Sequence, residues 1–149
     1  MSSPTGMPAP VSAALGYTIK LAQHALRLRV DDAIRPLGIT APQFAVLVAV
    51  DLDPGISNAA LARAAFVTPQ SMQGIVANLE RDGLLRRSAD PLHGRILRSE
   101  LTRSGRSVLG RAHAAVAAIE ERMTNSLKNA EIEQLSMLLR RCIDNLLQP

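Results

Sequence analysis

The sequence predicts a mainly α-helical protein with one β-hairpin, and its composition and patterning are the reasons. The chain has 149 residues, of which 47% are hydrophobic but only 2% aromatic, and it contains 22 Ala and 21 Leu. These are strong helix formers, whereas the aromatic and β-branched residues that favour sheets are scarce. Apolar residues also recur at helical spacing along most of the chain. A single domain with an aliphatic core is therefore expected.

Helix start and stop signals divide the chain into six helices. Thr40 with Gln43 forms a capping-box pattern, and Thr68 before Pro69 combines an N-cap with proline at the first helical position. Ser57, Thr102 and Asn129 are the other expected N-caps, and Gly83 is the expected C-terminal cap. The predicted helices cover residues 11–34, 41–52, 58–65, 69–82, 103–127 and 130–146, and residues 84–89 and 96–101 form the hairpin.

The ends of the chain differ in character. Residues 1–10 carry three Pro and one Gly without apolar periodicity, which indicates a disordered arm. The first, fifth and sixth helices, by contrast, are long and apolar over a broad face. Residues 11–149 therefore form one unit, whose long helices carry more apolar surface than a single small core can bury. A second copy of the chain is expected to complete that core.

Several classes of protein are excluded by what the sequence lacks. Cys142 is the only cysteine, so neither an intramolecular disulfide nor a cysteine-rich zinc site can form. No signal peptide is evident, and the longest apolar run, Phe44 to Val50, is far too short to cross a bilayer. Three aromatic rings are too few for base-stacking platforms. We expect a cytoplasmic protein without membrane contact.

The positive charge is concentrated in one segment. Between positions 81 and 111 there are eight arginines and three acidic residues, whereas the rest of the chain carries nine basic and ten acidic residues. This segment covers the end of the fourth helix, the hairpin and the start of the fifth helix. It indicates either a binding surface for a polyanion or a solvated basic face.

Two short helices followed by a hairpin with arginine at its tip form the outline of a winged helix-turn-helix. The first turns of the second short helix suit the major groove of DNA, since they present polar groups to base edges and backbone amides to phosphate. The residues concerned are Thr68, Gln70, Ser71 and Gln73. Gln can pair with adenine through two hydrogen bonds, and Arg95 at the tip is suited to a narrow minor groove.

These motifs resemble the MarR family of transcriptional regulators over residues 11–147. The matching segments are Leu37-Gly38-Ile39-Thr40 with Gln43, Leu61-Ala62, Leu79-Glu80-Arg81-Asp82-Gly83-Leu84-Leu85-Arg86-Arg87, Asp90-Pro91, Gly94-Arg95 and Leu101-Thr102-Arg103-Ser104-Gly105. Each segment is common on its own, but their order and spacing together are specific.

The resemblance implies a homodimer whose first, fifth and sixth helices intertwine and which presents two winged helices to a pseudo-palindromic operator. Residues 40–102 would then bind DNA, while residues 11–36 and 103–147 would dimerise. By position, Arg95 is similar to the family's wing-tip arginine, Arg87 to the arginine after the recognition helix, and Asp90 to the aspartate that orients the wing. Where the family often has Asp-x-Arg-Arg, this chain has His93-Gly94-Arg95. The ion pair that commonly braces the wing is therefore expected to be absent.

Other polar residues are assigned supporting roles. Arg63, Arg86 and Arg98 are expected to contact phosphates, and surface ion pairs are the alternative. Tyr17, His24, Arg27 and His113 are candidates for an effector cleft between the two parts of the molecule. Neither of these histidines has a partner at metal-ligand spacing, so no metal or other cofactor is expected. Cys142 occupies an apolar register position, where a buried, unreactive thiol is the expected outcome.

The function predicted from the sequence is that of an effector-responsive, DNA-binding regulator, most simply a repressor. The alternative is a winged-helix module that binds protein and has no specific DNA site. An enzyme is disfavoured because the sequence has no glycine-rich phosphate loop, no Cys/His pair at catalytic spacing and no G-x-S-x-G elbow. Salt-dependent binding to duplex DNA distinguishes the first two hypotheses.

Overall fold

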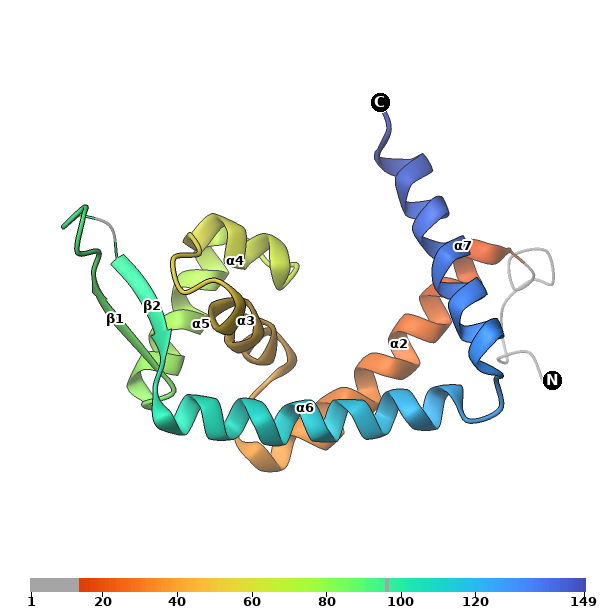
Figure 1. The fold of residues 1–149 in the computed structure, drawn as a ribbon, viewed down its shortest axis with the longest axis horizontal. Helices are drawn as coiled ribbons and strands as arrows, with labels where there is room; N and C mark the ends of the chain where they lie inside the picture. Colours follow the sequence, from red (N-terminus) through yellow and green to blue (C-terminus); the bar gives the residue numbers. More distant parts are fainter. Residues whose placement is uncertain (1–13, 96) are drawn as a thin grey trace.

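The computed structural model describes residues 14–95 and 97–149, and this part of the chain forms six α-helices and one hairpin (Figure 1). The elements are α2 (Leu15–Ile34), a 3₁₀ helix η1 (Arg35–Leu37), α3 (Ala41–Leu52), α4 (Asn58–Ala64), α5 (Pro69–Arg81), β1 (Leu85–Ala89), β2 (Leu97–Leu101), α6 (Arg103–Thr124) and α7 (Asn129–Leu147). The predicted fold class and order of elements are confirmed. The expected disordered arm, residues 1–10, and the first turn of the expected helix from residue 11 lie outside the described residues.

The predicted hydroxyl caps begin four of the helices. The hydroxyl oxygens of Thr40, Ser57, Thr68 and Thr102 each accept a hydrogen bond from the backbone N–H three residues later, at 3.4, 3.2, 3.1 and 2.9 Å respectively. At Thr40 the box is complete, because its own N–H donates to Gln43 Oε1 at 2.9 Å. These bonds satisfy amide groups that would otherwise have no partner at the helix N-termini.

Two predicted boundaries near the C-terminus are wrong by a few residues. The sequence predicts Leu127 within the fifth helix, but α6 ends at Thr124, whose hydroxyl donates back to the Glu120 carbonyl at 2.9 Å. The two residues that follow, Asn and Ser, are weak helix formers and allow the chain to turn there. Asn129 is predicted to be the last N-cap, but Lys128 holds that position, and its N–H donates to Glu131 Oε2 at 2.7 Å.

The long helix α6 forms the base of the molecule and connects its two ends (Figure 1). At one end α3, α4, α5 and the β1–β2 hairpin pack together, and α2 packs along α6 toward the other end, where α7 projects. The buried core is aliphatic, as the composition predicts. Its largest fully buried side chains are Ile34, Val46, Leu47, Val50, Leu61, Met72, Val76 and Leu79.

The end of α5 is fixed to the start of α6. Thr102 Oγ1 donates to the Gly83 carbonyl at 2.6 Å, and Thr102 N–H donates to the Leu84 carbonyl at 3.1 Å. One turn into α6, Gly105 is buried against the backbone of Leu84, so closely that a Cβ at this position would overlap the Leu84 carbonyl. The close approach therefore requires glycine.

Large hydrophobic residues on α2, on α7 and at the end of α6 are exposed and have no covering element in the described chain. No residue of α7 is buried, although the helix carries a full apolar stripe. The large hydrophobic residues left exposed on these helices and the α6–α7 turn are Leu15, Ile19, Leu21, Leu28, Met123, Leu127, Leu135, Met137, Leu138, Ile143, Leu146 and Leu147. Because burying each such side chain is worth about 1.5–3 kcal/mol, this surface favours association.

No single helix in the described ranges is long and apolar enough to cross a membrane, and only the bent pair 15–37 and 41–52, at 78°, reaches that length and composition together.

We predict that Gly105→Ala destabilises the protein by about 1–3 kcal/mol, because the added methyl group forces α6 away from Leu84. Thermal unfolding followed by circular dichroism measures this effect. Gly110→Ala is the matched control, since Gly110 lies on the same helix and a Cβ at that position would meet nothing within 4 Å. Ala is the better helix former, so this control is expected to raise the midpoint slightly. Equal midpoints for the two variants would show that the α5–α6 contact is not tight.

Candidate nucleic-acid interface

A short helix, a tight turn and a second helix present one polar face to solvent. Met72, Val76 and Leu79 of α5 are buried, which fixes the rotation of this helix about its axis. Gln70, Ser71 and Gln73 consequently lie exposed on its first turns. At the start of α5, the Asn58 side-chain amide donates to the Pro69 carbonyl at 3.2 Å, which links this end to the first turn of α4. The polar residues that the sequence assigned to base contacts therefore share a rigid, accessible surface.

The hydroxyl groups of Thr68 and Ser71 form hydrogen bonds with each other's residue. The Thr68 hydroxyl accepts from the Ser71 N–H and donates to Ser71 Oγ at 2.9 Å. Thr68 is thereby held as the N-cap, and Ser71 keeps its own hydroxyl proton for an outside acceptor. Gln70 and Gln73 have no side-chain hydrogen bond to any residue in the described ranges, so their amides are the freest base-reading groups on α5.

The turn between α4 and α5 has an unusual residue at its centre. The Val67 N–H donates to the Ala62 carbonyl at 3.0 Å and the Phe66 N–H to the Arg63 carbonyl at 3.2 Å, the hydrogen-bond pattern of a Schellman motif. The residue after the C-cap in this motif takes a left-handed conformation, and Phe66 has a φ of 54°. A bulky residue in this region costs about 1–3 kcal/mol. The sequence pattern does not single out Phe66, because a lone Phe between two short helices is usually a core residue.

The wing is held by Asp90. Strands β1 and β2 pair antiparallel from Leu85 opposite Leu101 to Ala89 opposite Leu97. Beyond the paired residues, Asp90 Oδ1 accepts from the N–H groups of Leu92 and His93, at 2.8 and 3.1 Å. Its Oδ2 lies 3.8 Å from Arg98 Nε on the opposite strand. An ion pair therefore joins the two sides of the wing, although the Asp-x-Arg-Arg pattern is missing.

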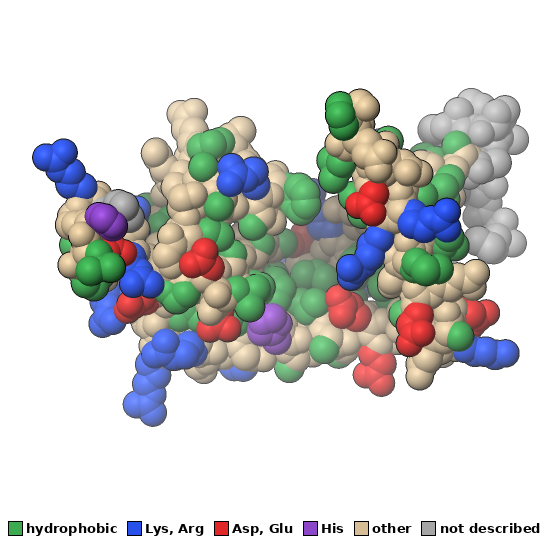
Figure 2. All heavy atoms as spheres, turned by 45° about the horizontal axis from the view of Figure 1, so that its top comes forward, with side chains coloured by type: hydrophobic (Ala, Val, Ile, Leu, Met, Phe, Trp, Pro, Cys, Tyr) green, Lys and Arg blue, Asp and Glu red, His purple; other side chains and the backbone are tan. Residues whose placement is uncertain are grey.

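Most of the arginines near the wing that the sequence assigns to DNA binding have an acidic neighbour. Arg86 pairs with Glu100 at 3.1 Å across the hairpin, and Arg87 pairs with Glu80 of α5 at 2.9 Å. The Arg87 pair joins β1 to the last turn of α5. Arg63 on α4 and Arg95 at the tip are exposed and have no ion pair within the part of the chain that the structure describes. Figure 2 shows that Lys and Arg side chains gather at the end of the molecule that carries the wing.

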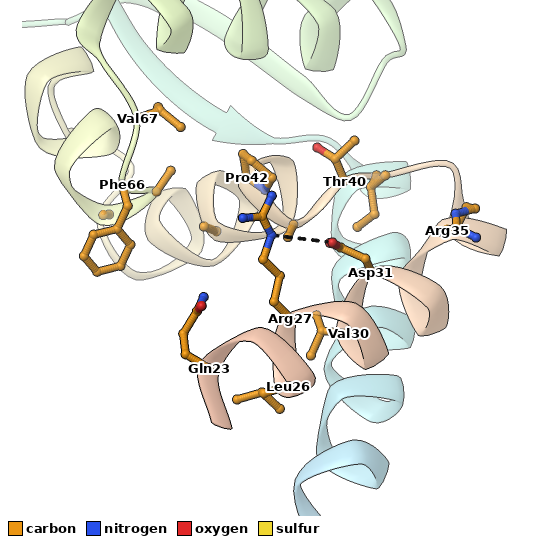
Figure 3. Close-up of a pocket in the computed structure, with 15 residues that line it drawn as sticks. Gln23, Leu26, Arg27, Val30, Asp31, Arg35, Thr40, Pro42, Phe66 and Val67 are labelled. Carbon is orange, nitrogen blue, oxygen red and sulfur yellow. Dashed lines mark ion pairs between the residues drawn. The ribbon is translucent and has the colours of Figure 1, made fainter. Parts of the chain in front are cut away.

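A cavity of about 830 Å³ opens between α2, the start of α3 and the α4–α5 turn (Figure 3). Its lining is mainly apolar, and its polar groups are those of Gln23, Arg27, Asp31, Arg35 and Thr40. Arg27 Nε lies 3.8 Å from Asp31 Oδ2, and 68% of the Arg27 side chain is exposed. The guanidinium group therefore remains accessible to a ligand anion.

Of the four effector candidates, the structure brings only Arg27 to this cavity. Tyr17 lies near the N-terminal end of α2, away from the cavity. His24 lies between the lining residues Gln23 and Leu26 in sequence but is not itself a lining residue. The ring of His113 on α6 packs edge-on against Phe44, with centroids 5.4 Å apart. Sequence reasoning missed Gln23, Arg35 and Phe66, since the cavity is assembled from segments up to 44 residues apart in sequence.

Two further candidates for chemistry, Cys142 and a metal site, belong neither to the winged helix-turn-helix nor to the cavity in the part of the chain that the structure describes. Cys142 is half-buried on α7, at the apolar register position expected for it. In the described residues, no group of three His, Cys, Asp or Glu side chains could hold a metal ion.

A helix-turn-helix with an exposed polar second helix, next to a basic hairpin, defines the winged-helix class of DNA-binding proteins. Comparison with known proteins agrees with this class. A family model described as MarR family matches residues 37–96. The HTH-type transcriptional repressor Rv2887 of Mycobacterium tuberculosis is 37% identical over 129 residues, which cover 87% of this chain and 93% of the relative.

Crystal structures of Rv2887 are also similar to this chain. The complex with salicylic acid gives a TM-score of 0.73 at 37% identity and covers 87% of this chain and 96% of its own. The complex with DNA gives a TM-score of 0.71 at 34% identity and covers 87% and 98%. The chain belongs to the MarR family. This confirms the predicted family and the predicted role of a DNA-binding transcriptional regulator.

Proposed function

We propose that this protein is a homodimeric repressor that places α5 of each subunit in the major groove and each wing beside a minor groove. The observation that carries this proposal is the exposed pair of amides, Gln70 and Gln73, on a helix whose other face is locked into the core. The similar protein Rv2887 is a repressor with a structure in complex with DNA. In this arrangement residues 40–102 bind DNA, and the proposed location is the cytoplasm.

The geometry supports the following residue roles. Gln70 and Gln73 are assigned to base edges, because glutamine can donate and accept in the plane of an adenine. Ser71, Thr68 and the α5 N-terminus are assigned to phosphate or base contacts at the groove edge. Arg95 is assigned to the minor groove, and Arg63, Arg86, Arg87 and Arg98 to phosphates or to holding the wing. Asp90 keeps the wing in shape, since it connects the tip amides to Arg98.

The dimer is proposed to form through α2, α6 and α7, which lie within the two segments, 11–36 and 103–147, that the sequence assigns to dimerisation. These helices carry the exposed apolar stripes described above, and MarR proteins are dimers. A two-fold dimer presents two copies of α5 to half-sites about 10 base pairs apart, which accounts for a pseudo-palindromic operator. The alternative, a module that binds only protein, does not explain a polar recognition face next to a basic wing.

The cavity is proposed to bind a small aromatic carboxylate as effector. Its volume lies in the range of about 300–1,000 Å³ typical of ligand pockets, and its apolar walls suit an aromatic ring. Arg27 can form charge-assisted hydrogen bonds with a carboxylate. The similar protein Rv2887 has a structure with salicylic acid. Because one wall is the α4–α5 turn, a bound effector can alter the spacing of the two recognition helices and weaken binding to DNA.

Arg95→Ala is expected to weaken binding to operator DNA and to reduce the slope of log K against log salt by roughly 0.9, as one lost phosphate interaction requires. Fluorescence anisotropy titrations with a labelled duplex at several salt concentrations measure both quantities. Arg140→Ala on α7 is the control, because it removes the same charge far from the wing. Identical slopes for the two variants would remove Arg95 from the interface.

Leu135→Glu is expected to convert the dimer largely to monomer at micromolar concentration, since it buries an unpaired carboxylate in the proposed interface. Gln134→Glu adds the same charge to the neighbouring position and is expected to remain dimeric. Sedimentation velocity distinguishes the two species. A dimeric Leu135→Glu protein would show that this face of α7 is not in the interface.

Arg27→Met is expected to lower affinity for salicylate by roughly 10- to 100-fold, which corresponds to the loss of one hydrogen-bonded charge. Isothermal titration calorimetry on the purified dimer measures it. Arg29→Met removes an arginine from the same helix but not from this cavity, so its affinity should match the wild type. A wild-type protein that gives no heat of binding with salicylate at millimolar concentration would contradict the proposed effector class.

A further inference from the structure

We propose that Phe66 is the residue through which an aromatic effector in the cavity acts on the recognition helix α5. This inference rests on the proposed effector and adds to it a specific contact and a specific path. It starts from a property of Phe66 that the fold does not explain.

The ring of Phe66 makes almost no contribution to the core. Its relative exposure is 96%, the highest of the large hydrophobic residues that the structure describes. The other phenylalanine, Phe44, packs against the core and against His113. An exposed phenylalanine gains nothing from burial, so packing in the single chain does not account for this residue.

The backbone conformation of Phe66 is also unfavourable for a residue with a bulky side chain. Three described residues have positive φ, and the other two are Gly38 at 77° and Gly83 at 71°. Gly83 ends α5 with the same pair of hydrogen bonds that Phe66 makes at the end of α4, from Leu84 to Leu79 and from Gly83 to Glu80. Glycine meets this requirement without strain. The chain therefore has a bulky residue with a strained backbone at a position where glycine would adopt the same conformation without strain.

The position of the ring suggests why phenylalanine is present at this position. Phe66 lines the cavity on the side opposite α2, and Figure 3 shows its ring extending from the α4–α5 turn toward Gln23, with Arg27 beside them. A flat aromatic acid that places its carboxylate at Arg27 presents its ring to the apolar walls and to Phe66. Offset or edge-on contact between two aromatic rings is favourable, and the exposed ring has both faces available for it.

Phe66 is also directly connected to α5. It lies two residues before Thr68, the N-cap, and the Val67 N–H ties the turn to the Ala62 carbonyl. The Asn58 amide, at the start of α4, donates to the Pro69 carbonyl at 3.2 Å. The start of α5 is therefore linked both to the turn, through the chain, and to α4, through this bond. A ligand that binds the Phe66 ring therefore biases the position of the helix end that carries Gln70 and Gln73.

The test compares wild type with Phe66→Gly, a substitution that suits the backbone and removes only the ring. We expect Phe66→Gly to retain the dimer, a melting temperature at least as high as wild type and unchanged affinity for operator DNA without effector. Its affinity for salicylate should fall by about tenfold, the scale of one lost aromatic contact. Salicylate should also reduce its DNA affinity by a smaller factor than in wild type, measured with effector at saturation for each protein.

Two further variants make the result specific. Phe66→Tyr keeps the ring and is expected to restore both salicylate affinity and the effect of salicylate on DNA binding. Leu52→Ala removes a different exposed side chain, at the end of α3 and outside the cavity, and is expected to behave as wild type in both.

The outcomes are distinguishable. If wild type does not bind salicylate, the proposed effector class fails and the role of Phe66 fails with it. If Phe66→Gly binds salicylate and releases DNA as wild type does, only the role of Phe66 is overturned. If Phe66→Gly becomes monomeric, or loses DNA affinity without effector, the ring belongs to a protein or DNA interface and the inference is also wrong.

Discussion

The contact between the end of α5 and the start of α6 determines how the two ends of this molecule relate. Thr102 donates through both its hydroxyl and its amide to the Gly83–Leu84 backbone, and Gly105 permits α6 to approach that backbone without a side chain between them. The helix proposed to face DNA and the helix that carries the proposed dimer surface are thereby joined by direct backbone contacts. Because these contacts hold the C-terminal end of α5, a proposed effector has more freedom to act on its N-terminal end.

That N-terminal end is bounded by the α4–α5 turn, which also forms a wall of the cavity. The same Schellman hydrogen bonds end α4 and α5, but the residue in the left-handed position is glycine in one case and phenylalanine in the other. Gly83 therefore adopts its left-handed conformation without strain at the C-terminal end of α5, whereas Phe66 is strained in the turn before its N-terminal end. This turn, which exposes the ring of Phe66, is the part of the molecule on which the proposed effector would act.

Local chemistry in the sequence was sufficient to predict the helices, since Thr40, Ser57, Thr68 and Thr102 all cap as expected. The polar residues expected on the outer face of α5, Gln70, Ser71 and Gln73, are exposed. The failures have physical causes. Lys128 rather than Asn129 is the N-cap because Glu131 reaches back to its amide, and both arrangements fit the same sequence. Of the effector candidates only Arg27 lines the cavity, because the cavity depends on how α2 packs against a turn far along the chain. No sequence pattern shows that Phe66 has a positive φ.

The bare helix α7 has a consequence for the abundance of this protein in a cell. A chain whose last helix buries no residue of its own gains much of its stability only when two copies meet, so its resistance to unfolding and to proteases follows mass action. Above the dissociation constant of the dimer the chain is protected, and below it α7 is left exposed to degradation. The cellular level of a regulator built in this way therefore has a lower threshold set by its own association.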